Sequence, residues 1–226
     1  MNYVISLKRT PERLKNFKLI NDHMKFEVFD AIDGEKLTPA HGYPKNALGN
    51  AQSHFELWKK CASGTDSYLI CEDDAEIHKN FEFMMQKFPK NYDFICFGWN
   101  FDADLWISTE PFLSPIKMSF DQNSMRINKK SYLENSFICN LFKLHLFNGT
   151  FCYLISPFGA SKFLEICFPL KRNINLQITS NHIINITPTA LDMAMSEAYQ
   201  ETNSYVCFPP IAISDNNHAI STVQNV

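Results

Sequence analysis

Three adjacent acidic residues, Glu72, Asp73 and Asp74, follow the apolar run at residues 68–71. The run predicts a buried strand, and in an open α/β sheet ligands bind beyond the carboxyl ends of the strands. Adjacent carboxylates repel one another, so such a cluster favours a nearby cation or basic side chain. A divalent cation held there could bind a diphosphate. A solvated acidic turn is the alternative, and the same acids would suit a metal-dependent phosphohydrolase or nuclease.

Basic and polar side chains near predicted helix starts and turns are further candidates for nucleotide binding. Arg9 and Arg13 are four residues apart, so they share a helical face and could both contact a nucleotide or diphosphate. Asp33, in a predicted tight turn, could accept hydrogen bonds from uracil or ribose. Ser53 and His54 lie in the first turns of a predicted helix, whose N-terminus favours anions. The structural alternatives are an exposed arginine pair, an ordinary turn and a histidine with a structural role.

Short apolar runs alternate with helical segments along most of the chain. Strands are predicted at residues 4–7, 26–29, 68–71, 93–97, 151–155 and 205–208, and helices from residue 10 and over 49–61, 78–88, 158–167 and 190–199. This alternation predicts an α/β fold with a mostly parallel central sheet. Residues 171–190 are expected to be irregular. We predict one domain over residues 1–226, with a polar, variable insertion at about 99–147 where the alternation is lost.

The composition excludes several classes of protein. With 21 basic and 24 acidic residues, the net charge of −3 argues against a general nucleic-acid binder. No stretch approaches the roughly 20 apolar residues that span a bilayer, and the N-terminus lacks a signal-peptide pattern. The seven cysteines have no C-x-x-C spacing, which argues against a zinc–cysteine site and favours a reducing compartment. We therefore expect a cytoplasmic protein.

The C-terminal part of the chain carries acidic residues without basic ones. No Lys or Arg follows Arg172, whereas Asp192, Glu197, Glu201 and Asp215 remain. A divalent metal or a basic face of the protein could balance these carboxylates. Scattered surface acids are the alternative interpretation.

Five segments, in the same order along the chain, resemble glycosyltransferase family 25, which contains bacterial lipopolysaccharide and lipooligosaccharide galactosyltransferases. They are residues 4–13 (VISLKRTPER), 29–34 (FDAIDG), 49–58 (GNAQSHFELW), 72–75 (EDDA) and 149–160 (GTFCYLISPFGA). The resemblance extends from residue 3 to about 165, with a looser match near Asp192 and Pro209-Pro210.

The resemblance implies a GT-A type nucleotide-sugar fold and an inverting transfer of a hexose from a UDP-sugar. The hexose would most simply be galactose in a β-1,4 linkage, and the acceptor a lipooligosaccharide or lipopolysaccharide glycan. The implied cofactor is Mn²⁺, or Mg²⁺. The residues implied in donor binding are Ser6, Leu7, Arg9, Arg13, Ala31, Asp33, Gly34, Ser53, His54, Glu72 and Asp73.

The resemblance also implies residues for the metal and for the proton transfer. Asp74 and Glu72 would hold the metal, and His218 near the C-terminus is a further candidate ligand, for which Asp215 competes. Asp192 occupies the place of a late family aspartate and would be the general base that takes the acceptor's proton. An ordinary acidic residue near a helix start is the alternative for Asp192.

The 99–147 segment would face the acceptor. Its aromatic residues, Trp99, Phe101, Trp106 and Phe112, could stack on a sugar ring, although core packing would explain some of them equally well. The basic residues Arg126, Lys129 and Lys130 could attract the protein weakly to anionic lipid at the inner face of the cytoplasmic membrane, or form a solvated loop.

Two other functions fit the same residues. A metal-dependent phosphodiester hydrolase would cleave phosphoesters without an acceptor sugar. A non-catalytic glycan-binding relative would bind a UDP-sugar without turnover, and an Asp192→Asn variant would behave like the unaltered protein.

Overall fold

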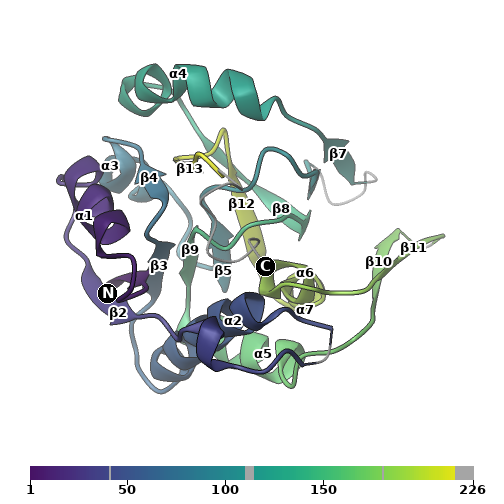
Figure 1. Cartoon of the computed structure of the whole chain (residues 1–226). Helices are drawn as coiled ribbons and strands as arrows, with labels where there is room; N and C mark the ends of the chain where they lie inside the picture. The colour runs from purple at the N-terminus through teal and green to yellow at the C-terminus, as the bar shows by residue number, and fades with distance from the viewer. Residues whose placement is uncertain (41, 110–114, 180, 217–226) are drawn as a thin grey trace.

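A computed structural model describes residues 1–40, 42–109, 115–179 and 181–216 of the chain. Within these residues, nine strands form one mixed sheet in the order β2-β1-β3-β9-β5-β12-β8-β6-β7 (Figure 1). The strands are β1 Asn2–Ser6, β2 Glu27–Asp30, β3 Tyr68–Glu72, β5 Phe94–Cys96, β6 Leu105–Ser108, β7 Ile116–Met118, β8 Asn140–Leu146, β9 Cys152–Ile155 and β12 Ser204–Phe208. β1 is parallel to β2 and β3, and β5 to β12, whereas the other neighbours are antiparallel. The predicted α/β fold class is confirmed.

Helices cover both faces of this sheet (Figure 1). They are α1 Pro11–Ile20, α2 Lys45–Ala62, α3 Phe81–Met85, α4 Gln122–Glu134, α5 Pro157–Cys167, α6 Leu191–Met195 and α7 Ala198–Glu201. Successive side chains of β1 point to opposite faces, so Tyr3 and Ile5 join the core with α2 and α5, whereas Val4 joins the core with α1 and α3. Burial on both faces explains why the strands of the N-terminal half are continuous apolar runs.

The turn after β2 lies directly against the start of α2, and two glycines permit this approach. A Cβ atom on Gly34 would lie 2.3 Å from the carbonyl oxygen of Lys45, and one on Gly49 would lie 2.5 Å from that of Ile32. Larger residues would therefore separate α2 from the 3₁₀ turn η1 Gly34–Lys36. Because α2 begins at Lys45, after Pro44, the predicted start at Gly49 is four residues too late.

The segment at 99–147 is part of the sheet. It supplies β6, β7 and β8, together with α4, so it carries regular structure that the loss of the strand–helix alternation did not indicate. Its strands pair antiparallel with partners distant in sequence, such as β8 with β12, and local apolar runs gave little sign of them.

Two smaller predictions also require correction. Residues 171–190, expected to be irregular, contain the hairpin β10 Ile174–Thr179 and β11 His182–Ile186. Buried and exposed residues alternate along β10, a strand pattern obscured by the Asn and Thr content. The helix predicted at 78–88 is limited to α3, because β4 Ala75–Ile77 precedes it and pairs with β13 Ala212–Ser214.

Candidate active site

A depression of about 460 Å³ lies at the carboxyl ends of β1 and β3. Nine of the eleven residues predicted to bind the donor line it, namely Ser6, Leu7, Arg9, Arg13, Ala31, Gly34, Ser53, Glu72 and Asp73. Asn46 and Asn50 from α2 also contribute to its wall. We call this depression the donor cavity. The remaining two predicted residues, Asp33 and His54, do not line it but contact residues that do.

Asp73 organises the floor of the donor cavity. Its Oδ2 accepts a hydrogen bond from Ser6 Oγ at 2.7 Å, and its Oδ1 lies 2.7 Å from Arg13 Nη2. Burial raises the pKa of Asp73, while the Arg13 charge and the Ser6 hydroxyl act in the opposite direction. Asp73 therefore holds Arg13 at the cavity. Because its side chain is only 7% exposed, Asp73 has little surface left for a ligand.

Ser53 and Asp33 fix the turn that forms one side of the donor cavity. Ser53 Oγ donates to the Gly49 carbonyl at 2.7 Å and accepts from the Ile32 N–H at 2.8 Å. Asp33 Oδ1 accepts from the Glu35 N–H and lies 3.3 Å from Arg9 Nε. These two residues, which were predicted to bind the sugar donor, therefore shape the cavity by holding the backbone of the turn.

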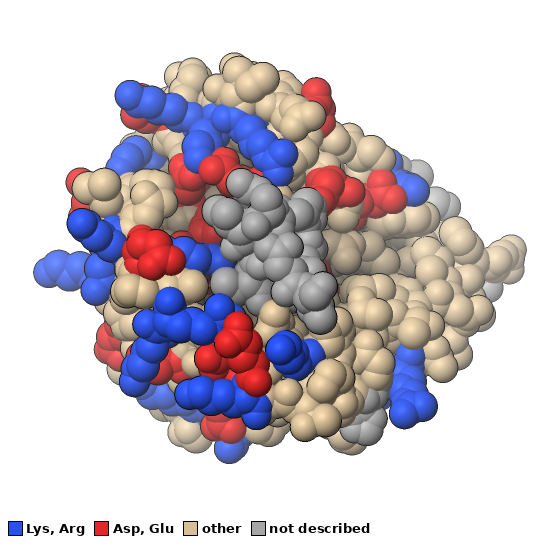
Figure 2. All heavy atoms as spheres, in the orientation of Figure 1, with Lys and Arg blue, Asp and Glu red and all other residues tan. Residues whose placement is uncertain are grey.

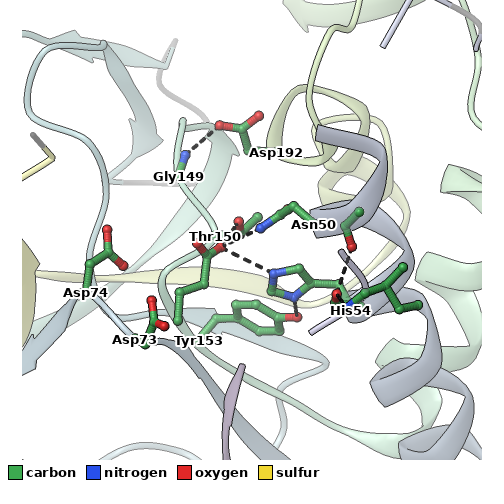
Figure 3. A network of polar contacts seen from close by, with 12 residues as sticks. Asn50, His54, Asp73, Asp74, Gly149, Thr150, Tyr153 and Asp192 are labelled. Atoms are coloured by element: carbon green, nitrogen blue, oxygen red, sulfur yellow. Dashed lines mark hydrogen bonds and ion pairs between the residues drawn. The ribbon is translucent and has the colours of Figure 1, made fainter. Parts of the chain in front are cut away.

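Glu72 is the centre of a buried hydrogen-bond network, and its neighbours Asn50, His54, Thr150 and Tyr153 are labelled in Figure 3. Its Oε1 accepts from Asn50 Nδ2 at 3.1 Å and from the Thr150 hydroxyl, and it lies 3.3 Å from His54 Nε2. His54 Nδ1 lies 2.6 Å from the hydroxyl of Tyr153. Burial by itself would raise the pKa of Glu72, but the contacts with His54, Thr150 and Asn50 outweigh it and lower that pKa. Glu72 is therefore an ionised and firmly held carboxylate.

A second depression, of about 940 Å³, adjoins the donor cavity. Its walls include Asp74, Asn100, Gly149, Thr150, Thr189, Asp192 and Asn216. It shares Asn50 and Glu72 with the donor cavity, so the two form one continuous site. We call it the acceptor cavity.

Asp192 lines the acceptor cavity near the start of α6. Its Oδ2 accepts from the Gly149 N–H at 2.7 Å (Figure 3), and its Oδ1 accepts from the Met193 N–H at 2.8 Å. Burial raises its pKa above the ordinary value, while these two N–H groups oppose the rise. A carboxylate with a raised pKa, fixed in a cavity, can accept a proton from a hydroxyl group.

Sequence reasoning missed several polar residues of these walls. Asn50 and Thr150 lie inside the family-like segments, so the resemblance could have indicated them. Asn100 and Asn216 had no such signal, because they reach the acceptor cavity from loops distant in sequence.

Asp74 faces the acceptor cavity and is held from the far end of the described chain. Ser214 Oγ, on β13, donates to Asp74 Oδ2 at 3.0 Å. Enclosure by the cavity walls and the negative charge of Glu72 raise the pKa of Asp74. Asp74 stays 41% exposed, so it is more accessible to a ligand than Asp73.

Basic residues of α4 hold β13 in place. Arg126 donates to the backbone carbonyls of Asp215 and Asn216 at 2.7 and 2.8 Å. Lys129 Nζ lies 2.5 Å from Glu76 Oε1 and 2.8 Å from Asp215 Oδ2. Basic side chains over α4 accordingly lie beside acidic ones in Figure 2.

These contacts concern two predicted roles. Arg126 and Lys129 bind other parts of the chain, and their weak attraction to anionic lipid stays a prediction. Asp215 Oδ2 pairs with Lys129, and the role of Asp215 as a metal ligand also stays a prediction. His218 lies outside the described residues.

The residues present fit a cation that is shared with a substrate. Among the described residues, no group of three or more His, Cys, Asp or Glu side chains could hold a metal ion by itself. Mg²⁺ in proteins is commonly held by one or two carboxylates together with substrate phosphates, and Mn²⁺ prefers similar ligands. Asp74 offers such a carboxylate, whereas Glu72 Oε1 already receives three donors.

Two of the aromatic residues expected to face a sugar are core residues. Trp99 and Phe101 are buried and pack against Phe120, and Trp99 also stacks on Phe208. Trp106 is partly exposed on β6. Phe112 lies outside the described residues.

The sequence matches the profile of glycosyltransferase family 25 (LPS biosynthesis protein) over residues 1–178. No curated protein sequence matches significantly. Among solved structures, the crystal structure of A197 from STIV is similar, with 12% identity, a TM-score of 0.41, and coverage of 91% of this chain and 79% of that chain. No helix of the described residues has the length and hydrophobicity needed to cross a membrane.

Proposed function

The chain belongs to glycosyltransferase family 25, a family of lipopolysaccharide biosynthesis proteins, and from this premise we propose its reaction. It transfers a hexose, most simply galactose from UDP-galactose, to a hydroxyl group of a lipooligosaccharide or lipopolysaccharide glycan. The transfer inverts the anomeric carbon and gives a β-1,4 linkage.

One observation supports this proposal most directly. The donor cavity and the acceptor cavity meet at Asn50 and Glu72, with the predicted donor residues on one side and Asp192 on the other. A nucleotide diphosphate in the first cavity would present its sugar to an acceptor hydroxyl in the second. A phosphodiester hydrolase would not require a second cavity of this size.

The chain's own residues account for binding and proton transfer. Arg13, held by Asp73, would neutralise part of the charge on the diphosphate. Asp192 would accept the proton of the acceptor hydroxyl while the oxygen forms a bond to the anomeric carbon. The bond between that carbon and the diphosphate oxygen breaks, and UDP leaves with the bonding electrons.

We place a divalent cation, Mn²⁺ or Mg²⁺, at Asp74. The cation supplies charge stabilisation at the departing diphosphate when it is bound. Asp74 is oriented for this role by Ser214, which is in turn held through β13 by Arg126 and Lys129 on α4.

The test is a donor panel with the purified full chain. UDP-galactose, UDP-glucose and UDP-N-acetylglucosamine are each incubated with truncated lipooligosaccharide acceptors, with Mn²⁺ or with EDTA, and the anomeric configuration of the product is determined by NMR. We expect Mn²⁺-dependent transfer of one hexose with inversion. Phosphoester cleavage without an acceptor requirement would favour the hydrolase, and UDP-sugar binding without turnover would favour a non-catalytic glycan-binding protein.

A further inference from the structure

Glu72 and Asn50 occupy the boundary between the two cavities. Both residues line both cavities. The side chains of Asn50, His54 and Thr150 all contact one oxygen of Glu72, Oε1, and hold the carboxylate in place. On the proposed function, the transferred sugar must cross this boundary, because it is attached to the diphosphate on one side and attacked from the other. Within the part of the chain that the structure describes, all three contacts of the Glu72 side chain fall on Oε1, so Oε2 can receive a sugar hydroxyl.

A buried chain of hydrogen bonds leads to Glu72 from the core and has a defined direction. The Trp58 indole N–H can only donate, and it donates to the Tyr153 hydroxyl oxygen at 2.8 Å. We assign the Tyr153 proton to the bond with His54 Nδ1, which makes this nitrogen an acceptor. A neutral His54 then carries its proton on Nε2 and donates it to Glu72 Oε1. This assignment gives all four groups a suitable partner.

The three residues behind Glu72 do not line either cavity. Trp58 and His54 are fully buried, and Tyr153 is 1% exposed. His54 was predicted to bind the donor, but it is fully buried and contacts the cavity wall through Glu72. Its contacts suit a residue that orients another one.

We propose that Glu72 recognises a hydroxyl group of the transferred hexose, and that His54, Tyr153 and Trp58 are positioning residues that hold Glu72 for this purpose. Glu72 then distinguishes a UDP-sugar from UDP, while Asp74 serves the metal. This inference rests on the proposed function.

The first test compares UDP with the UDP-sugar that the unaltered protein binds most tightly in the donor panel. In Glu72→Gln, the side-chain oxygen can still accept from Asn50, His54 and Thr150, but an NH₂ group replaces the oxygen that faces the sugar. We expect the affinity for the UDP-sugar to fall about 10- to 100-fold, with the affinity for UDP in Mn²⁺ changed less than about twofold. A loss of Mn²⁺-dependent UDP affinity would instead identify Glu72 as a metal ligand and overturn the proposal.

The second test separates positioning from general stability. Tyr153→Phe removes the hydroxyl that links Trp58 to His54, and we expect UDP-sugar affinity to fall about three- to tenfold relative to UDP affinity. Tyr199→Phe is the matched control, because Tyr199 is equally buried, packs in the same core, and its hydroxyl has no hydrogen-bond partner among the described residues. It should leave the affinity ratio unchanged.

The ratio of UDP-sugar affinity to UDP affinity decides between these outcomes, because a loss of stability alone would not change it. A lower melting temperature for Tyr153→Phe with an unchanged ratio would overturn the positioning role. If the unaltered protein binds neither UDP nor any UDP-sugar, the proposed function itself fails, which is a different result from a selective loss in the variants.

Discussion

The two cavities that meet at Glu72 are built from different parts of the chain. The donor cavity draws all its lining residues from the first 73 positions, where β1, β2 and β3 are adjacent and parallel. The acceptor cavity draws on segments from Pro44 to Asn216. Its central carboxylates depend on distant partners, since Asp74 is bound by Ser214 and Asp192 by Gly149.

The residues of the two cavities are therefore brought together in two different ways. On the donor side, neighbouring parallel strands place their carboxyl ends together, so residues after each strand converge without further contacts. On the acceptor side, convergence requires α4 and β13 to be in place first. Substitutions on the two sides should therefore change different measurements.

The largest effect is expected for Asp192→Asn. Because Asn cannot take the acceptor's proton, kcat for transfer should fall by about 10²- to 10⁴-fold, while UDP affinity stays unchanged. Steady-state kinetics and calorimetry measure the two quantities. Glu197→Gln in the same segment, which pairs with Lys171 outside both cavities, is the control and should retain the transfer rate. Retention of most activity by Asp192→Asn would place the base elsewhere.

The pH profile should report the same carboxylate. Burial raises the pKa of Asp192 above its usual 3.8, and only the ionised form can accept a proton. As the pH falls through this raised pKa, kcat/KM should therefore decline, about tenfold per pH unit below the midpoint. An acidic limb centred at or below 3.8 would contradict a buried aspartate as the base.

Asp74 is the exception to this division: it lines the acceptor cavity, but since it would hold the cation on the diphosphate, Asp74→Asn should act on donor binding. We expect the affinity for UDP in Mn²⁺ to fall at least about tenfold, to the value that the unaltered protein shows in EDTA. Asp66→Asn, beyond the opposite end of β3, controls for the loss of one negative charge. If Mn²⁺ strengthens UDP binding equally in Asp74→Asn, the metal is held by other residues.

Lys129→Met tests how far the acceptor cavity depends on its distant support. Removing the ammonium group leaves Glu76 and Asp215 unpaired at the junction of α4, β4 and β13. The free energy of unfolding should fall by about 1–2 kcal/mol, which corresponds to a melting temperature about 2–8 °C lower. Lys130→Met, at the exposed neighbouring position, should change neither stability nor transfer. Equal melting temperatures for the two variants would show that α4 does not support the site.

Ser53→Ala should have the smallest effect and stay on the donor side. It removes the hydroxyl that joins the Gly49 carbonyl to the Ile32 N–H. We therefore expect the binding free energy of UDP to weaken by about 1 kcal/mol, which corresponds to about fivefold lower affinity. Ser63→Ala, just after α2, provides the matched control. A Ser53→Ala variant with a reduced transfer rate but normal UDP affinity would contradict the division between the two cavities.

The sequence predicted more of the donor cavity than of the acceptor cavity. Arg13, Asp73 and Ser6 were predicted separately as donor-binding residues, from a helical face, a strand end and the family resemblance, and the structure brings them together along one cavity. The contacts of Arg126 and Lys129 were not predicted, because their partners are 89 and 86 positions away in the chain.

The sequence alone determined the α/β class, the family and most of the residues that line the donor cavity. Apolar runs, turn glycines and strand ends express local preferences, and these suffice where consecutive parallel strands are neighbours in space. Only the tertiary structure decided that residues 99–147 extend the sheet, that Ser214 holds Asp74, and that His54 lies behind Glu72. Those arrangements depend on antiparallel pairing and buried polar contacts between distant segments, whose geometry exists only once the core is packed.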